Sequence, residues 1–153
     1  MNCAKYFALL LLCVAGSGRP IFRNTPVPTP VAQNTASAPS FMSAEQLKAK
    51  LARNEPVTVI DVRDTETYLK SNRIKDSIYV KLRRLAYRVT MPPLKDLPRD
   101  RDVVTYCACP HDEASIRAAQ ILLDAGFKRV HVLQGGWQMW VKVNGQVAPR
   151  PRA

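Results

Sequence analysis

Short apolar segments in the second part of the chain constrain the fold more than any other feature. They read PVTVIDV, IYVKL (78–82), DVVTYC and RVHVL, and amphipathic segments lie between them. A strand that is apolar on both sides is typical of a parallel sheet, because helices cover both faces of such a sheet. The alternation therefore predicts an α/β domain with a parallel sheet.

Capping and stop signals predict helices between these strands. Ser43 followed by Gln46 is a capping box at the start of AEQLKAKLARN, and Asp64 caps a second helix in DTETYLKSN. The alanine-rich segment EASIRAAQILLDAG predicts the longest helix, which Gly126 ends. LRRLAYRV predicts a helical turn, and QGGWQMWVKV predicts a Gly-Gly turn followed by a last short helix.

The N-terminal part of the chain does not follow this alternation. Residues 1–18 hold one lysine, an apolar run and then small residues, which is typical of a signal peptide. The run of about ten residues is too short to span a bilayer as a helix. Residues 19–40 are rich in Pro, Thr and Ala, which predicts a solvated linker. We expect the folded domain at residues 41–149 and a tail at 150–153.

The signal peptide predicts export to the periplasm or the extracellular space, without stable membrane insertion after cleavage. The alternative is a protein that stays anchored by this apolar segment. Cleavage would remove Cys3 and Cys13, so that the mature protein would keep Cys107 and Cys109. Two cysteines this close cannot join distant parts of a fold, which indicates chemistry rather than architecture.

The net charge of +11 has a simpler interpretation than nucleic-acid binding. Lys and Arg are scattered along the chain, and no nucleic-acid-binding motif accompanies them. We therefore expect a basic surface and no specific nucleic-acid partner.

The segment VVTYCACPHDEAS, residues 103–115, is the candidate site. Ligands of open parallel sheets bind at the carboxyl ends of the strands, and this segment runs from such an end to the start of a helix. Its residues are compatible with a catalytic loop, a redox pair, a metal site or only the end of a buried strand.

The chain resembles the rhodanese homology domain over about 41–149. Three motifs carry the resemblance: VIDVRD at the end of a strand, an apolar strand that ends in YC, and AGFKRVHVLQGGWQMW, which is similar to the Gly-Gly-x-x-x-Trp ending of the family. The resemblance implies a three-layer α/β/α fold with a mainly parallel sheet, in which Trp137 and Trp140 pack in the core.

The resemblance also implies sulfur transfer. A cysteine at the strand end takes a sulfane sulfur as a persulfide and passes it to a thiol-type acceptor, and Cys107 occupies that position. Loop N–H groups and the positive end of the following helix favour the reactive thiolate. The expected partners are a small sulfur donor and a thiol acceptor, with no cofactor and a monomeric protein. The residues expected to contact substrate are Ala108, Cys109, His111, Asp112, Glu113, Ala114 and Ser115.

The candidate loop departs from the family pattern. It is two residues longer, it lacks the usual glycine and arginine, and Pro110 removes one N–H from any anion cradle. Asp112 and Glu113 add negative charge. We expect poor binding of thiosulfate or phosphate, which favours a low-charge donor such as a persulfide and disfavours the phosphatase branch of the fold. Arg63 is interpreted as a packing or surface residue.

Cys109 has three interpretations. It is an inert loop residue, it resolves a persulfide or sulfenate on Cys107 into a disulfide, or it is itself the nucleophile. The last interpretation requires the strand to extend by two residues. A Cys-x-Cys disulfide closes a small ring and would be reducible rather than structural.

Other functions compete with sulfur transfer. Cys107, Cys109 and His111 are metal-ligand types, but no fourth ligand is evident, so we expect no metal. One rival is a non-catalytic module whose altered loop binds a partner protein. The other is a thiol redox protein that uses the Cys107/Cys109 pair.

Overall fold

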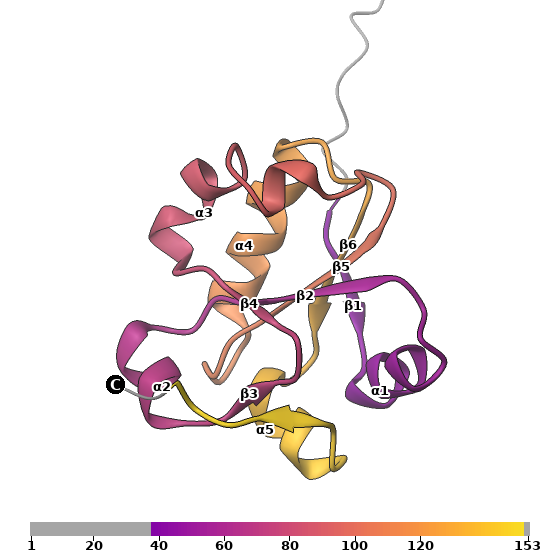
Figure 1. The fold of residues 1–153 in the computed structure, drawn as a ribbon, viewed down its shortest axis with the longest axis vertical. Coiled ribbons are helices and arrows are strands. Elements are labelled where there is room, and N and C mark those ends of the chain that lie inside the picture. The colour runs from indigo at the N-terminus through magenta and orange to yellow at the C-terminus, as the bar shows by residue number, and fades with distance from the viewer. Residues whose placement is uncertain (1–37, 152–153) are drawn as a thin grey trace, which may run out of the picture. The chain divides into compact units, whose positions relative to one another are not determined.

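A computed structural model describes residues 38–151 of the chain. Its main sheet has five strands in the order β1-β6-β5-β2-β4, and all four pairings are parallel (Figure 1). The strands are β1 (Ser40–Met42), β2 (Val57–Asp61), β4 (Ile78–Tyr79), β5 (Asp102–Tyr106) and β6 (Arg129–Leu133). The predicted parallel α/β sheet is confirmed.

Helices cover both faces of this sheet, which gives the three layers (Figure 1). The helices are α1 (Ala44–Ala52), α2 (Thr65–Lys70), α3 (Leu82–Arg88), the short 3-10 helix η1 (Leu94–Asp96), α4 (Glu113–Asp124) and α5 (Gly136–Lys142). Val103 of β5 packs in a core with Leu85 and Leu122 of α3 and α4. Its neighbour Val104 packs in a second core with Leu47 and Trp140 of α1 and α5. Successive residues of one strand therefore enter opposite cores.

The predicted caps form. The Ser43 backbone N–H donates to Gln46 Oε1 over 2.9 Å, and the Gln46 N–H donates to Ser43 Oγ over 3.2 Å. The Asp64 carboxylate accepts from the Thr67 N–H over 2.9 Å. Gly126 follows α4 with φ of +89°, a left-handed conformation that glycine adopts readily.

The structure corrects the predicted strand at residues 78–82. β4 contains only Ile78–Tyr79, and Leu82 already begins α3. The reason is that α3 must start here to place Leu85, which is fully buried, under α4. The apolar run IYVKL therefore belongs to two elements.

Two short pairings have no counterpart in the predicted pattern. Ser40 lies at the end of the predicted linker but begins β1, whose three residues pair with β6. Near the C-terminus, β7 (Val147–Ala148) pairs antiparallel with β3 (Arg73–Ile74) in a separate two-stranded sheet. Strands of two or three residues are too short to show a periodic pattern.

The predicted signal peptide, and the linker as far as residue 37, lie outside the described residues. Among the helices of residues 38–151, none has the length and apolar character needed to cross a bilayer.

Candidate active site

Cys107 directly follows β5, at the carboxyl end of the strand. The parallel pairing of β5 with β2 ends at Tyr106, opposite Asp61, so the strand does not extend to Cys109. Cys107 is 2% exposed and packs in the same core as Val103, beneath α3 and α4. Strand alternation sets this direction, because residues 103, 105 and 107 share one side of the sheet.

The two loop cysteines are joined in a disulfide. The Cα atoms of Cys107 and Cys109 are 5.7 Å apart, and the Cys109 N–H also donates to Cys107 Sγ over 3.4 Å. Cys109 is partly exposed, whereas Cys107 is buried. The structure therefore shows the oxidised pair, in which Cys109 is the more accessible member.

The start of α5 holds the cysteine loop in place. The Trp137 N–H donates to the Cys107 carbonyl oxygen over 2.8 Å, and Gln138 Nε2 donates to the Ala108 carbonyl oxygen over 3.1 Å. Gly136 has φ of +48°, and a Cβ at this position would collide with the Cys107 carbonyl oxygen. The segment Gly135 to Gln138 is thus a clamp on the loop, and we use the term clamp for these four residues below.

The predicted site residues did not include the clamp. Its one sequence signal is the Gly-Gly pair, since adjacent glycines mark a backbone that must turn sharply or approach another segment closely. The partner of that close approach, the loop some 30 positions away, is not readable from a single sequence.

Asp112 contributes to the same clamp and does not cap α4. It lies just before the helix with φ of +57°, and its side chain makes no capping hydrogen bond. Asp112 Oδ2 instead accepts from the Gly135 N–H over 2.8 Å. The residue is 7% exposed, and its Oδ1 has no hydrogen-bond partner among the described residues. The negative charge expected near the substrate is therefore turned toward the clamp.

His111 and Glu113 lie on the surface of the loop. Their side chains are 84% and 59% exposed, with His111 Nδ1 3.3 Å from Glu113 Oε1. A hydrogen bond from its own backbone N–H, and then one from His111, hold the pKa of Glu113 below its usual range. Within residues 38–151, no three His, Cys, Asp or Glu side chains gather in a possible metal site.

Ala114 and Ser115 connect the loop to the core. Ala114 packs against the core beneath α3 and α4. Ser115 is fully buried, and its carbonyl oxygen accepts from Thr105 Oγ1 of β5 over 2.9 Å. The Ser115 hydroxyl has no partner in the described part of the chain. These residues fix the first turn of α4 beside the end of β5.

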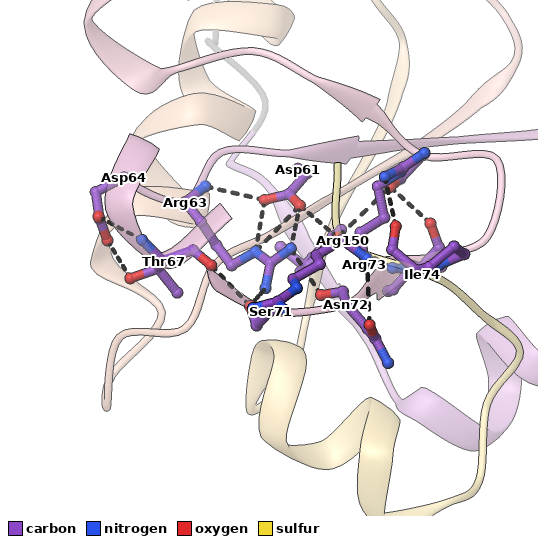
Figure 2. Close-up of polar contacts among 12 residues, drawn as sticks. Asp61, Arg63, Asp64, Thr67, Ser71, Asn72, Arg73, Ile74 and Arg150 are labelled. Atoms are coloured by element: carbon purple, nitrogen blue, oxygen red, sulfur yellow. Dashed lines mark hydrogen bonds and ion pairs between the residues drawn. The ribbon is translucent and has the colours of Figure 1, made fainter. Parts of the chain in front are cut away.

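Arg63 and Asp61 form a buried ion pair with further polar contacts around it (Figure 2). Asp61 is paired in the sheet with Tyr106, which packs in the core opposite to that of Cys107. Arg63 Nη2 lies 2.7 Å from Asp61 Oδ2, and both side chains are 0% exposed. Arg63 Nη1 donates to Ser71 Oγ over 2.7 Å, and Nη2 also donates to the Asn72 carbonyl oxygen over 3.0 Å. Arg63 is therefore a packing arginine, as predicted, and its hydrogen bonds go to Asp61, Ser71 and Asn72.

Tyr106 links this ion pair to the cysteine. Its hydroxyl donates to Asp61 Oδ2 over 2.6 Å, and Cys107 is the next residue in the chain. Burial, followed by the neighbouring Asp61 charge, raises the pKa of Tyr106, so the hydroxyl stays protonated and keeps this bond. The bond therefore fixes Tyr106, the last residue before the cysteine loop.

Comparison with known proteins identifies the domain. The profile of the rhodanese-like domain family matches residues 43–143. The chain is 30% identical over 101 residues to a protein of Allochromatium vinosum named "Sulfurtransferase", covering 66% of this chain and 87% of that protein. It is 30% identical over 93 residues to "Thiosulfate sulfurtransferase GlpE" of Pseudomonas savastanoi pv. phaseolicola, covering 61% and 80%.

Solved structures show the same fold. The crystal structure of the Alr3790 protein from Anabaena sp. has a TM-score of 0.61 and 31% identity, with 71% of this chain and 81% of that chain covered. The crystal structure of the BH2092 protein from Bacillus halodurans has a TM-score of 0.62 and 28% identity, with 72% and 77% covered.

Proposed function

Because the chain belongs to the rhodanese-like domain family, we propose that it is a sulfurtransferase in which Cys107 carries a persulfide and passes the sulfur to a thiol acceptor. Relatives named as sulfurtransferases support this at the level of the family. The observation that carries the proposal is the position of Cys107, directly between the end of β5 and the loop that leads to the N-terminus of α4.

The proposed reaction has two displacements at sulfur. The Cys107 thiolate attacks the outer sulfur of a persulfide donor, the donor S–S bond breaks, and the donor thiol leaves as a thiolate. An acceptor thiolate then attacks the outer sulfur of the Cys107 persulfide, and the Cys107 thiolate is restored. The N-terminus of α4 stabilises the thiolate in both steps, because the helix dipole favours negative charge there.

The loop favours a donor of low charge. Residues 107–112 contain no Lys or Arg, and the exposed Glu113 carries a negative charge beside them. A dianion such as thiosulfate would meet repulsion and no bidentate guanidinium, the group best suited to binding such anions. We therefore propose a small persulfide as the donor, although relatives of the chain are named for thiosulfate.

The experiment that tests the proposal uses the reduced full chain with Cys109→Ser, so that Cys107 is the one cysteine left in the loop. After incubation with a small-molecule persulfide, covalent catalysis predicts a mass gain of about 32 Da, one sulfur atom, on the peptide that contains Cys107. The matched control is the Cys107→Ser/Cys109→Ser double variant, which should gain no mass on this peptide. An unmodified Cys107 after treatment with several persulfide donors would contradict the proposal.

A thiol redox protein is the second candidate, and the Cys107–Cys109 disulfide is the observation that favours it. Such a protein would oxidise a dithiol substrate without any sulfur donor. Mixing the oxidised protein with a dithiol peptide, and following peptide disulfide formation, separates this function from sulfur transfer.

We also propose that the protein is exported. The predicted signal peptide at residues 1–18 supports this, and so does the disulfide, because such bonds persist mainly in oxidising compartments. N-terminal sequencing of the protein from the producing cells is the test. A mature form that begins shortly after residue 18 is expected, and an intact N-terminus would contradict cleavage.

A further inference from the structure

We propose that Cys109 resolves the Cys107 persulfide: its thiolate displaces the outer sulfur as hydrosulfide and closes the disulfide that the structure shows. This inference rests on the proposed function, since it needs a persulfide on Cys107. It changes the product, because the sulfur leaves as sulfide and not as a sulfurated thiol.

The geometry of the loop carries the inference. Resolution requires Cys109 Sγ to reach Cys107 Sγ, and these two atoms are bonded in the structure. The Cys109 N–H donates to the same Cys107 Sγ over 3.4 Å, which keeps the turn between the two residues closed. No movement of the loop beyond the observed conformation is needed to bring the attacking and the attacked sulfur together.

The residues on either side of Cys109 are held by the clamp. The Ala108 carbonyl oxygen accepts from Gln138 Nε2, and the Asp112 carboxylate accepts from the Gly135 N–H. Pro110 further limits the backbone after Cys109. A reduced Cys109 is therefore kept beside Cys107, and the attack gains the advantage of an intramolecular reaction over an external thiol.

The step balances in atoms and electrons. The Cys109 thiolate supplies an electron pair to Cys107 Sγ, the bond from Cys107 Sγ to the outer sulfur breaks, and that sulfur leaves as HS⁻. The sulfane sulfur is reduced to sulfide, and the two cysteine thiols are oxidised to the disulfide. No further oxidant or reductant enters this turnover.

The next turnover requires an external dithiol reductant. In the disulfide state its thiolate attacks Cys109, the partly exposed member of the pair, in preference to Cys107, which is 2% exposed. Cys107 then leaves as the thiolate, which the N-terminus of α4 stabilises. The second thiol of the reductant releases Cys109 by closing its own disulfide.

The test is a single turnover of the fully reduced protein, without oxygen and without free reductant. Glutathione persulfide is added to the wild-type chain and to Cys109→Ser, and sulfide release is measured together with intact mass after thiol alkylation. We expect the wild type to release about one sulfide per protein. Neither loop cysteine should then be alkylated, because both are in the disulfide. We expect Cys109→Ser to keep the persulfide and to release sulfide slower by on the order of 100-fold or more.

The outcomes separate the inference from the function on which it rests. A wild-type protein that retains the persulfide and releases sulfide no faster than Cys109→Ser overturns resolution by Cys109, while sulfur transfer stands. The absence of a persulfide in Cys109→Ser, together with no sulfide from the wild type, overturns both. If a serine at position 109 disturbs folding, the wild-type measurements alone test the inference. Resolution requires sulfide and the Cys107–Cys109 disulfide to appear in equal amounts and at the same rate, and unequal amounts overturn it.

Discussion

The backbone N–H of Trp137 donates a hydrogen bond to the carbonyl oxygen of Cys107 over 2.8 Å. This bond joins the first turn of α5 to the residue that directly follows β5. The neighbouring Gly136 makes the contact possible, since its backbone approaches the same carbonyl oxygen too closely for any side chain. The Gly-Gly-Trp ending of the domain therefore serves the cysteine loop and not only the core.

A methyl group at Gly136 tests this contact. Gly136→Ala places a Cβ against the Cys107 carbonyl oxygen at a position with φ of +48°. We expect a loss of unfolding free energy of more than about 2 kcal/mol, because steric repulsion adds to the left-handed backbone cost of about 1–2 kcal/mol. Urea unfolding measures the loss, and persulfide formation by the Cys107 thiol should slow as the loop shifts.

Gly126→Ala is the matched control for that variant. Gly126 also has a positive φ, of +89°, but a Cβ there would meet nothing within 4 Å. The Gly126→Ala variant should lose only the unfolding free energy that a left-handed backbone costs, and its rate of persulfide formation should stay at the wild-type value. Equal destabilisation by the two substitutions would mean that the close approach to Cys107 is unimportant.

The bond between Asp112 and Gly135 is open to a second test. Asp112→Ala removes the acceptor of the partly buried Gly135 N–H, which we expect to cost about 1–3 kcal/mol of unfolding free energy. Asp112→Asn keeps an oxygen acceptor and tolerates the φ of +57° at this position. Chemical denaturation should therefore place Asn close to the wild type and Ala well below it; an equal loss of stability in both variants would show that the charge matters more than the bond.

The core of the fold could be predicted from the sequence because the information is local. The runs that form β2, β5 and β6 are rich in valine, and the caps at Ser43 and Asp64 lie within four residues of their acceptors or donors. These signals depend on neighbours in the chain, so one sequence is enough to read them.

The site could be predicted only in part, because its contacts join distant segments through backbone atoms. The clamp bonds to Cys107 and Ala108 involve carbonyl oxygens, which leave no mark on residue identity. Asp112 shows the same limit. An acid before a helix is typical of a cap, but here the left-handed backbone turns the carboxylate toward Gly135. For Cys109 the sequence leaves three interpretations open, and the structure pairs it with Cys107.

The buried ion pair between Arg63 and Asp61 should be essential for stability. Arg63→Met would leave the Asp61 carboxylate buried without its counter-charge, and breaking a buried pair in this way costs about 3–5 kcal/mol. The matched control is Lys70→Met, which removes the exposed pair with Glu66 and should leave the unfolding free energy almost unchanged. Thermal and urea unfolding measure the loss of stability in both variants. A similar loss in the two would show that the Asp61 charge is solvated.

The last prediction concerns Asp102 and the dependence of stability on pH. Burial alone would raise the pKa of Asp102, but hydrogen bonds from His131 and Lys50, and the charge of Arg129, hold it below its usual value of 3.8. A carboxylate with a lowered pKa stabilises the fold above its unfolded pKa and loses this contribution as the pH falls through the folded pKa. We therefore expect the unfolding free energy to fall as the pH decreases below about 4. Asp102→Asn should be less stable at neutral pH, and its unfolding free energy should depend less on pH in this acid range. Asp96→Asn, at an exposed position, should follow the wild-type curve. Urea titrations between neutral pH and the acid limit provide the measurement, and parallel curves for wild type and Asp102→Asn would refute the assignment.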